Sequence, residues 1–141
     1  GAVMQITVSD NGVFQRLQGS IGRATKRALA RAAAAQELSI KHRTARGKGL
    51  NGKFKPYSAD YIEYRESKGR QTAPVNHHFT GRMLASIHWK ANRNRAKLFF
   101  SSSAEKKKAA RTHALRPWWG ITDREQATIN RIFSKELARV V

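Results

Sequence analysis

Apolar and polar residues alternate near the start of the chain, a pattern typical of a half-buried strand. Over residues 4–9, Met4, Ile6 and Val8 fall on one face and polar side chains occupy the positions between them. An Asp-Asn-Gly turn at residues 10–12 follows. The pattern predicts a short strand with one face against a core.

A long helix is predicted next, from residue 13 to about residue 43, because apolar residues recur there at steps of three and four. The apolar stripe consists of Phe14, Leu17, Ile21, Ala24, Ala28, Ala32 and Ala35. The opposite side carries Arg16, Arg23, Lys26, Arg27 and Arg31. Because the stripe is mostly alanine after Ile21, it permits close packing but buries little area, so we expect this part of the helix to need a partner.

The composition changes after this helix. Residues 46–53 are rich in glycine and lysine and nearly free of apolar side chains, which predicts a mobile basic loop over about residues 43–55. Larger anchors follow at Phe54, Pro56, Tyr57, Tyr61, Ile62 and Tyr64. The three tyrosines have helical spacing, so we predict a short helix over about residues 58–66, then a second loose stretch at 67–73.

A β-hairpin is predicted in the second half of the chain. Thr80 is placed to cap a short helix that contains Met83 and Leu84, because a threonine oxygen can accept from the free amides of a first turn. Two alternating runs follow at residues 87–91 and 97–101, separated by asparagine and arginine residues.

The last part of the chain predicts a basic helix over residues 104–112, a short strand over 118–121, and a final amphipathic helix. Thr122 and Glu125 have the spacing of a capping box, and Asp123 adds a second acid to the first turn. The apolar face of this helix comprises Ile129, Ile132, Phe133, Leu137 and Val140.

This order of elements predicts an α+β fold: a small antiparallel sheet packed against a long N-terminal helix and a C-terminal amphipathic helix, with long basic loops. A length of 141 residues predicts a single domain over residues 1–141. Residues 1–3, which precede Met4, are either an expression tag or the native start. Leu, Ile, Val and Phe make up about 20% of the chain, which is low enough to predict mobile segments between the ordered elements.

The composition also limits the class of protein. The chain has no cysteine, which excludes disulfides and thiolate zinc sites and agrees with a cytosolic protein. No apolar run approaches the roughly 18 residues needed to span a bilayer, and the start lacks the pattern of a signal peptide. We therefore expect a soluble protein with no membrane partner and no export signal.

No catalytic or cofactor-binding constellation is predicted. The histidines are His42, His77, His78, His88 and His113, and no spacing places two of them on one face near an acid. Asp60, Glu63 and Glu66 resemble the solvated side of a helix rather than a catalytic carboxylate pair. Glycine-rich phosphate loops are absent, and the serines at 101–103 lack the glycines of a nucleophile elbow. We expect no catalytic residue, no cofactor and no metal.

Charge is the strongest signal in the sequence. There are 28 Lys and Arg against 9 Asp and Glu, a formal net charge of +19. Such an excess attracts polyanions or acidic protein partners, although a solvated basic face is the alternative. The candidate contacts with anions or acidic partners are Arg46, Lys48, Lys53, Lys106, Lys107, Lys108 and Arg111.

Several short motifs follow one another in a recognisable order. Lys-Phe-Lys-Pro-Tyr-Ser at 53–58 precedes Tyr61, Pro-Val-Asn at 74–76 precedes Thr-Gly-Arg-Met-Leu-Ala-Ser-Ile at 80–87, and Arg-Pro-Trp-Trp-Gly-Ile-Thr-Asp stands at 116–123. With the leading long helix, this order resembles the tail-completion and head–tail joining proteins of tailed bacteriophages, also labelled virion morphogenesis or minor tail proteins. The resemblance covers about residues 13–140.

The resemblance implies a structural protein without catalytic activity, a subunit of a ring, commonly of six copies, at the neck or the head-proximal end of the tail. The implied partners are further copies, other head–tail connector and tail-tube proteins, and DNA passing through a central channel. The implied location is the virion, and the host cytoplasm during assembly. The alanine-rich helix and the loop at 43–55 would then become ordered on assembly.

The positions that carry the resemblance are expected to serve the fold and the assembly. They are Tyr57, Ser58, Tyr61, Thr80, Gly81, Met83, Leu84, Trp118, Trp119 and Gly120. Gly81 would allow a tight entry to the helix at Met83, and Gly120 would let Trp119 end a strand directly before the cap at Thr122. The chain departs from the family pattern at His77 and His78, where an Asn/Asp-Leu pair is expected, and in its high charge.

Two other functions stay open. A small basic nucleic-acid-binding protein would be a monomer or dimer whose DNA affinity falls steeply as salt rises. A metal-dependent nuclease would use His77, His78 and a distant acid, and His78→Ala would abolish its cleavage.

Overall fold

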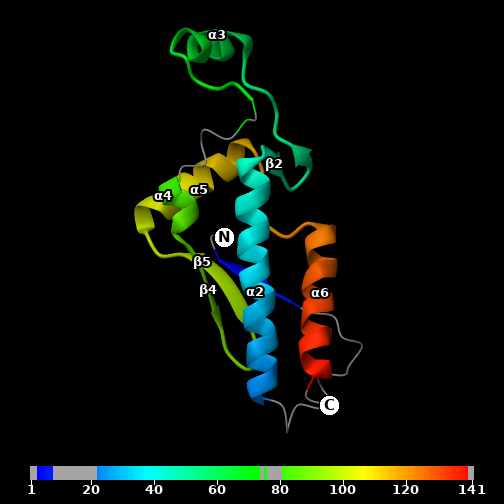
Figure 1. Ribbon diagram of the computed structural model, residues 1–141. Helices are drawn as coiled ribbons and strands as arrows, with labels where there is room; N and C mark the ends of the chain where they lie inside the picture. Colours follow the sequence, from blue (N-terminus) through cyan, green and yellow to red (C-terminus); the bar gives the residue numbers. More distant parts are fainter. Residues whose placement is uncertain (1–2, 8–21, 74, 76–80, 140–141) are drawn as a thin grey trace.

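The computed structural model of the protein describes residues 3–7, 22–73, 75 and 81–139. Its elements are, in chain order, β1 (Met4–Ile6), α2 (Gly22–Ala45), β2 (Lys48–Gly49), β3 (Gly52–Lys53), α3 (Ala59–Ser67), α4 (Gly81–Ala85), β4 (Ile87–Ala91), β5 (Ala96–Phe100), α5 (Ser103–Leu115) and α6 (Asp123–Ala138). The fold is α+β, with a small antiparallel sheet packed against the long helix α2 and the C-terminal helix α6 (Figure 1). The predicted fold class is confirmed.

The main sheet has three strands in the order β1-β5-β4, all antiparallel. Leu98 in the central strand lies opposite Met4 on one side and Trp89 on the other. Met4, Ile6 and Leu98 are buried on the face of the sheet that α2 crosses (Figure 1). The predicted first strand and hairpin are confirmed for the described residues, whereas Val8 lies outside them.

The alanine-rich stretch of α2 is largely buried within the chain. Ala28, Ala32 and Ala33 have no exposed surface, and α6 runs along α2 in the opposite direction (Figure 1). Small side chains allow two helices to approach closely, so Ile129 and Phe133 of α6 reach this surface. The partner that this part of the helix was expected to need is α6 of the same chain. The predicted residues Phe14, Arg16, Leu17 and Ile21 lie outside the described residues.

A mobile loop was predicted over residues 43–55, and this prediction is wrong. Arg43 and Thr44 are buried in the last turn of α2, and β2 and β3 form a two-stranded hairpin behind it. Gly47 and Gly52 have φ of 76° and 97°, a backbone conformation that glycine adopts without steric cost. The glycines therefore build a tight turn structure instead of a flexible linker.

The predicted strand at 118–121 is also wrong. Residues 117–122 have no regular secondary structure, because their backbone groups bond to side chains of α2 and α5 instead of to a neighbouring strand. The predicted helices α3, α5 and α6 are confirmed, with Ser58, Ser102 and Thr122 as their N-caps. The capping box of Thr122 and Glu125 is complete.

The short helix predicted after Thr80 is α4, which contains the fully buried Met83 and the partly buried Leu84. Ile87 belongs to β4 and not to this helix. Thr80 lies outside the described residues. Within the part of the chain that the structure describes, no helix combines the length and the apolar character needed to cross a membrane.

Candidate assembly surfaces

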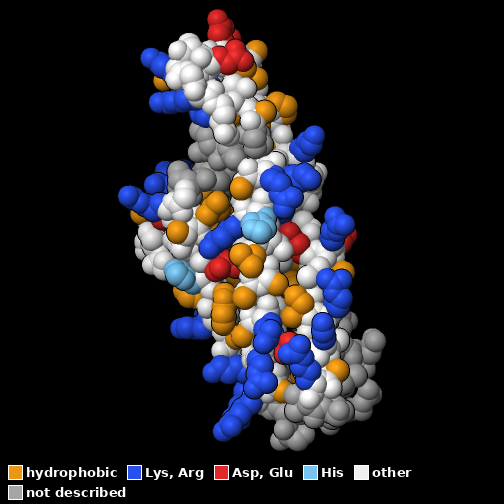
Figure 2. All heavy atoms as spheres, viewed as in Figure 1, with side chains coloured by type: hydrophobic (Ala, Val, Ile, Leu, Met, Phe, Trp, Pro, Cys, Tyr) orange, Lys and Arg blue, Asp and Glu red, His pale blue; other side chains and the backbone are white. Residues whose placement is uncertain are grey.

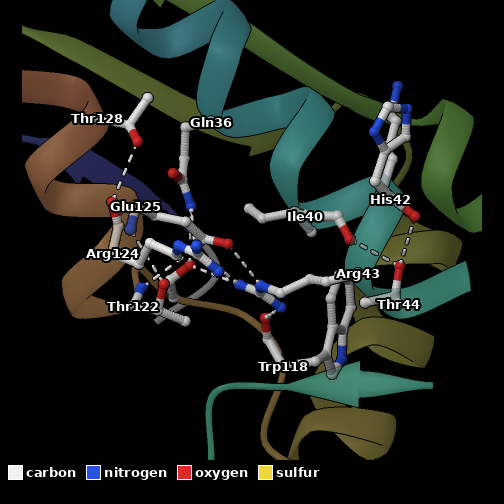
Figure 3. A network of polar contacts seen from close by, with 12 residues as sticks. Gln36, Ile40, His42, Arg43, Thr44, Trp118, Thr122, Arg124, Glu125 and Thr128 are labelled. Carbon is white, nitrogen blue, oxygen red and sulfur yellow. Dashed lines mark hydrogen bonds and ion pairs between the residues drawn. The ribbon is translucent and has the colours of Figure 1, made fainter. Parts of the chain in front are cut away.

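Arg43 lies at the centre of a polar network that joins the end of α2, the loop at 117–122 and the start of α6 (Figure 3). Its Nη1 donates to the Trp118 carbonyl at 2.8 Å, and its Nη2 donates to the Gly120 carbonyl at 3.0 Å. Its Nε donates to Oε2 of Glu125 at 2.9 Å, in an ion pair whose side chains are only 10% and 12% exposed. We call these four residues together with Gln36 the Arg43 clasp.

The carboxylate of Glu125 is held from several sides. Gln36 Nε2 donates to its Oε1 at 3.0 Å and to the Gly120 carbonyl at 3.1 Å. The Thr122 amide also donates to Oε1, at 3.1 Å. Burial alone raises the pKa of Glu125, but the hydrogen bonds from Arg43, Gln36 and Thr122 lower it by more, so the pKa lies below its ordinary value.

The tryptophan pair is fixed by α5. His113 Nδ1 accepts from the backbone amides of Trp118 and Trp119 at 3.2 and 3.1 Å, which requires an unprotonated Nδ1. The indole of Trp118 is fully buried and donates to Thr112 Oγ1 at 2.9 Å. The predicted motif residues Trp118, Trp119 and Gly120 therefore lie in a loop whose backbone is held by both α2 and α5.

Two glycines allow the hairpin to approach this loop. A Cβ on Gly49 would lie 2.3 Å from the Pro117 carbonyl oxygen, and one on Gly120 would lie 2.9 Å from the Leu50 side chain. The Leu50 amide donates to the same Pro117 carbonyl at 2.9 Å. Close approach, and not the end of a strand, is thus the reason for glycine at 120. At Gly81, a Cβ would meet nothing within 4 Å among the described residues.

The helix α3 projects beyond the end of α2, away from the sheet and the helix pair (Figure 1). Its inner side is well packed, since the guanidinium of Arg65 lies 5.6 and 5.8 Å from the ring centres of Tyr57 and Tyr61. Ser58 Oγ accepts from the Tyr61 amide at 3.2 Å and caps the helix. The predicted residues Tyr57, Ser58 and Tyr61 therefore build this projection, which we call the α3 arm (residues 54–73).

The outer side of the α3 arm is acidic. Asp60, Glu63 and Glu66 are exposed, and Tyr64 beside them is 49% exposed. Figure 2 shows acidic side chains gathered at the outer end of the projection. Four other acids form ion pairs within the chain, namely Glu37, Glu105, Glu125 and Glu136. In the described part of the chain, the three acids of α3 form none.

A groove of about 540 Å³ runs between α5 and the tryptophan loop. Its apolar lining includes Phe100, Ala110 and Trp119, and the rings of Phe100 and Trp119 lie 4.6 Å apart. Lys106 and Lys107 also line it, and both are exposed, which places them at its rim. We call it the α5 groove, and it unites an apolar floor with a basic edge.

The basic residues predicted to contact anions fall into two separate places. Arg46 and Lys48 line a cleft of about 430 Å³ near the start of α6, and Lys53 is exposed on β3 close by in sequence. Lys106, Lys107 and Arg111 are exposed on α5. Lys108 pairs with Glu105 at 3.3 Å and is therefore partly neutralised.

A third basic surface joins α2 to α6 and was not predicted as a unit. It consists of Arg23, Arg27, Arg31, Arg131, Lys135 and Arg139, all exposed. Glu136 links the two helices, 3.3 Å from Arg31 and 3.4 Å from Arg139. Figure 2 shows basic side chains clustered over the lower part of this helix pair. The sequence indicated the arginines of α2, but the antiparallel pairing with α6 is a tertiary feature.

Metal binding has no support in residues 3–7, 22–73, 75 and 81–139, which contain no group of three or more His, Asp or Glu side chains able to hold an ion. His77 and His78, the candidates for a nuclease centre, lie outside these residues.

No family model matches the chain, and neither the curated proteins nor the solved structures give a match.

Proposed function

We propose that this chain is a structural subunit of the head–tail junction of a tailed phage or prophage, a neck, head–tail joining or tail-completion (tail-terminator) protein without catalytic activity. It assembles into a ring, commonly of six copies. Its partners are further copies of the chain, head–tail connector and tail-tube proteins, and DNA in a central channel. Its location is the virion, and the host cytoplasm during assembly.

The observation that carries the proposal is the α3 arm. The core of the chain takes no residue from α3, since its buried residues lie in α2, the sheet, α4, α5, α6 and the tryptophan loop, with Phe54 at the root of the arm. The arm adds no member of α3 to that core, yet its own inner side is fixed by Arg65 between two tyrosines. A projecting helix that adds no residue to the core of its own chain is typical of a segment that contacts a neighbouring subunit.

The motifs that resemble the phage family support the same function because they belong to one structural unit. Arg116 Nε donates to the Lys55 carbonyl at 3.2 Å, and its guanidinium lies 5.6 Å from the ring centre of Tyr57. The third motif thus holds the root of the arm that the first motif builds. Residues far apart in sequence therefore act together to direct the arm.

The test is native mass spectrometry of the purified chain at low and high salt, with and without a short DNA duplex, followed by negative-stain electron microscopy. We expect a closed ring that persists without DNA. A strict monomer or dimer under all of these conditions would contradict the proposal.

A small basic nucleic-acid-binding protein is the second candidate, and the basic surface of α2 and α6 favours it. Arginine binds phosphate oxygens in a bidentate geometry, and Arg23, Arg27 and Arg131 form no ion pair within the described residues. This function predicts duplex binding by a monomer or dimer. The logarithm of the binding constant should fall by roughly 0.9 per neutralised phosphate for each unit of log salt. Replacing these three arginines by glutamine should then reduce the salt slope.

A further inference from the structure

We propose that copies of this chain associate head to tail, with the acidic outer side of the α3 arm of one copy seated in the α5 groove of the next. The inference rests on the proposed function, because it names the contact from which the ring is built. Each copy would use its arm on one neighbour and its groove on the other.

Charge complementarity is the first argument. The chain carries +19, yet Asp60, Glu63 and Glu66 cluster on one short helix and find no basic partner in the described part of the chain. The base of α3, Arg65, is buried and lies against Tyr57 and Tyr61 on the inner side. The outer side of the arm is thus an acidic surface on a basic protein, and a second copy is a ready source of cations.

The α5 groove supplies those cations. Lys106 and Lys107 stand at its rim, and Arg111 is exposed one turn further along α5. The only acid of this helix, Glu105, is buried and paired with Lys108. The bases at the rim therefore have no acid of their own helix to neutralise them.

The apolar surfaces of the arm and the groove are complementary as well. Asp60, Glu63 and Tyr64 lie at steps of three and four, so the half-exposed tyrosine ring and two carboxylates share one side of α3. The groove presents Phe100, Ala110 and Trp119 between its lysines. A volume of about 540 Å³ accommodates an aromatic ring, and tyrosine is a frequent anchor at the centre of interfaces.

The arm cannot reach the groove of its own chain in this fold. Figure 1 places α3 beyond the upper end of α2, while α5 lies below α3, between α4 and the upper part of α2. The root of the arm is held there by the bond from Arg116 to the Lys55 carbonyl and by the bond from Leu50 to the Pro117 carbonyl. Because arm and groove are different surfaces, the contact between copies is heterologous and closes into a ring or continues as a filament.

Charge reversal tests the contact. The arm variant carries Asp60→Lys with Glu63→Lys, and the groove variant carries Lys106→Glu with Lys107→Glu. We expect each variant alone to self-associate at least about tenfold more weakly than the parent chain, measured by native mass spectrometry and light scattering. An equimolar mixture should regain assembly, with the two variants alternating, so that only even-numbered rings form. A chain that carries both reversals should also assemble.

A matched control for the groove variant replaces two bases by acids elsewhere. Arg93→Glu with Arg95→Glu alters the exposed turn between β4 and β5 and should leave assembly intact. Rings that survive both the arm and the groove reversal would overturn this contact and leave the proposed function standing. A parent chain that forms no oligomer at all would overturn both.

A cross-link gives an independent readout, because the chain contains no cysteine. Tyr64→Cys combined with Ala110→Cys should form disulfide-linked dimers and higher multimers under mild oxidation. Tyr64→Cys combined with Ala127→Cys, an exposed position on α6, should not. Cross-links confined to single chains, or equal multimers in both pairs, would overturn the proposal.

Discussion

The Arg43 clasp and the α3 arm use charge in opposite ways. In the clasp, Arg43 and Glu125 are about nine-tenths buried and bonded to each other. In the arm, the carboxylates of α3 are exposed and form no ion pair within the described chain. A buried, paired charge fixes the architecture of one chain, whereas an exposed and unpaired one is available to another molecule. Substitutions in the two regions should therefore affect different measurements.

The largest loss of folding stability is expected for Arg43→Met. The substitution removes the ion-pair partner of a buried carboxylate and one hydrogen-bond donor from each of the carbonyls of Trp118 and Gly120, which should cost about 3–5 kcal/mol. Urea unfolding measures it. Arg46→Met makes the same substitution at an exposed position and should change the free energy of unfolding by no more than about 0.5 kcal/mol. Equal losses for the two variants would show that the clasp has no special role.

Gly49→Ala should cause the next largest loss of folding stability. The added methyl group would overlap the Pro117 carbonyl and the Phe54 ring, so the hairpin must move away from the tryptophan loop, at a cost of about 1–3 kcal/mol. Gly81→Ala is the matched control, since nothing among the described residues lies within 4 Å of the new methyl group. Equal losses of stability in the two alanine variants would contradict the close approach at Gly49.

Acid should weaken the clasp through Glu125. Since the folded-state pKa is below the ordinary value, the carboxylate stabilises the fold above the unfolded pKa of about 4.3. This contribution is lost as the pH falls through the folded-state pKa. Glu125→Gln should be less stable at neutral pH by about 1–3 kcal/mol and should lose less stability between pH 5 and 2. Parallel pH curves for the two proteins would contradict this assignment.

The smallest effect on folding is expected in the arm. Glu63→Lys and Tyr64→Ser alter exposed positions, so the free energy of unfolding of the monomer should change by no more than about 0.5 kcal/mol, although assembly is weakened. Urea unfolding at high salt, where the monomer is favoured, gives the measurement. A loss above about 1 kcal/mol would mean that the arm serves the fold of its own chain.

Local rules predicted most of the regular elements, although they missed the β2–β3 hairpin and predicted a strand at 118–121 that does not form. The alternation of β1 depends on neighbouring residues alone, and so does the capping box at Thr122. These features could be read from short windows of sequence, and the structure confirms them. The α+β class followed from their order.

The clasp could not be predicted, because its partners lie far apart in the chain. Arg43 bonds to residues 75 to 82 positions away, and Gln36 bonds to one 89 positions away. In the sequence, Arg43 is one of many bases at the edge of a glycine-rich segment, which is why a mobile loop was expected there. The same bonds remove the backbone groups that a strand at 118–121 would need.

The acidic surface of the arm also could not be predicted from the sequence. Asp60, Glu63 and Glu66 are surrounded by bases along the chain and resemble an ordinary solvated helix side. Only the projection of α3 shows that those neighbouring bases do not pair with them. The groove likewise needs α5 and the tryptophan loop side by side, which no local pattern indicates.

The long sequence separation within the clasp has a consequence for the order of folding. The bonds from Gln36 and Arg43 to Glu125 close a loop that contains the hairpin, α3, the second half of the sheet and α5. Closing so long a loop is entropically slow and depends on α6, which the ribosome synthesises after all of these elements. The root of the arm is held through the loop at 116–120, which the clasp fixes. A nascent chain would therefore acquire a correctly directed arm only when α6 docks, which would delay the proposed self-association until α6 has been synthesised.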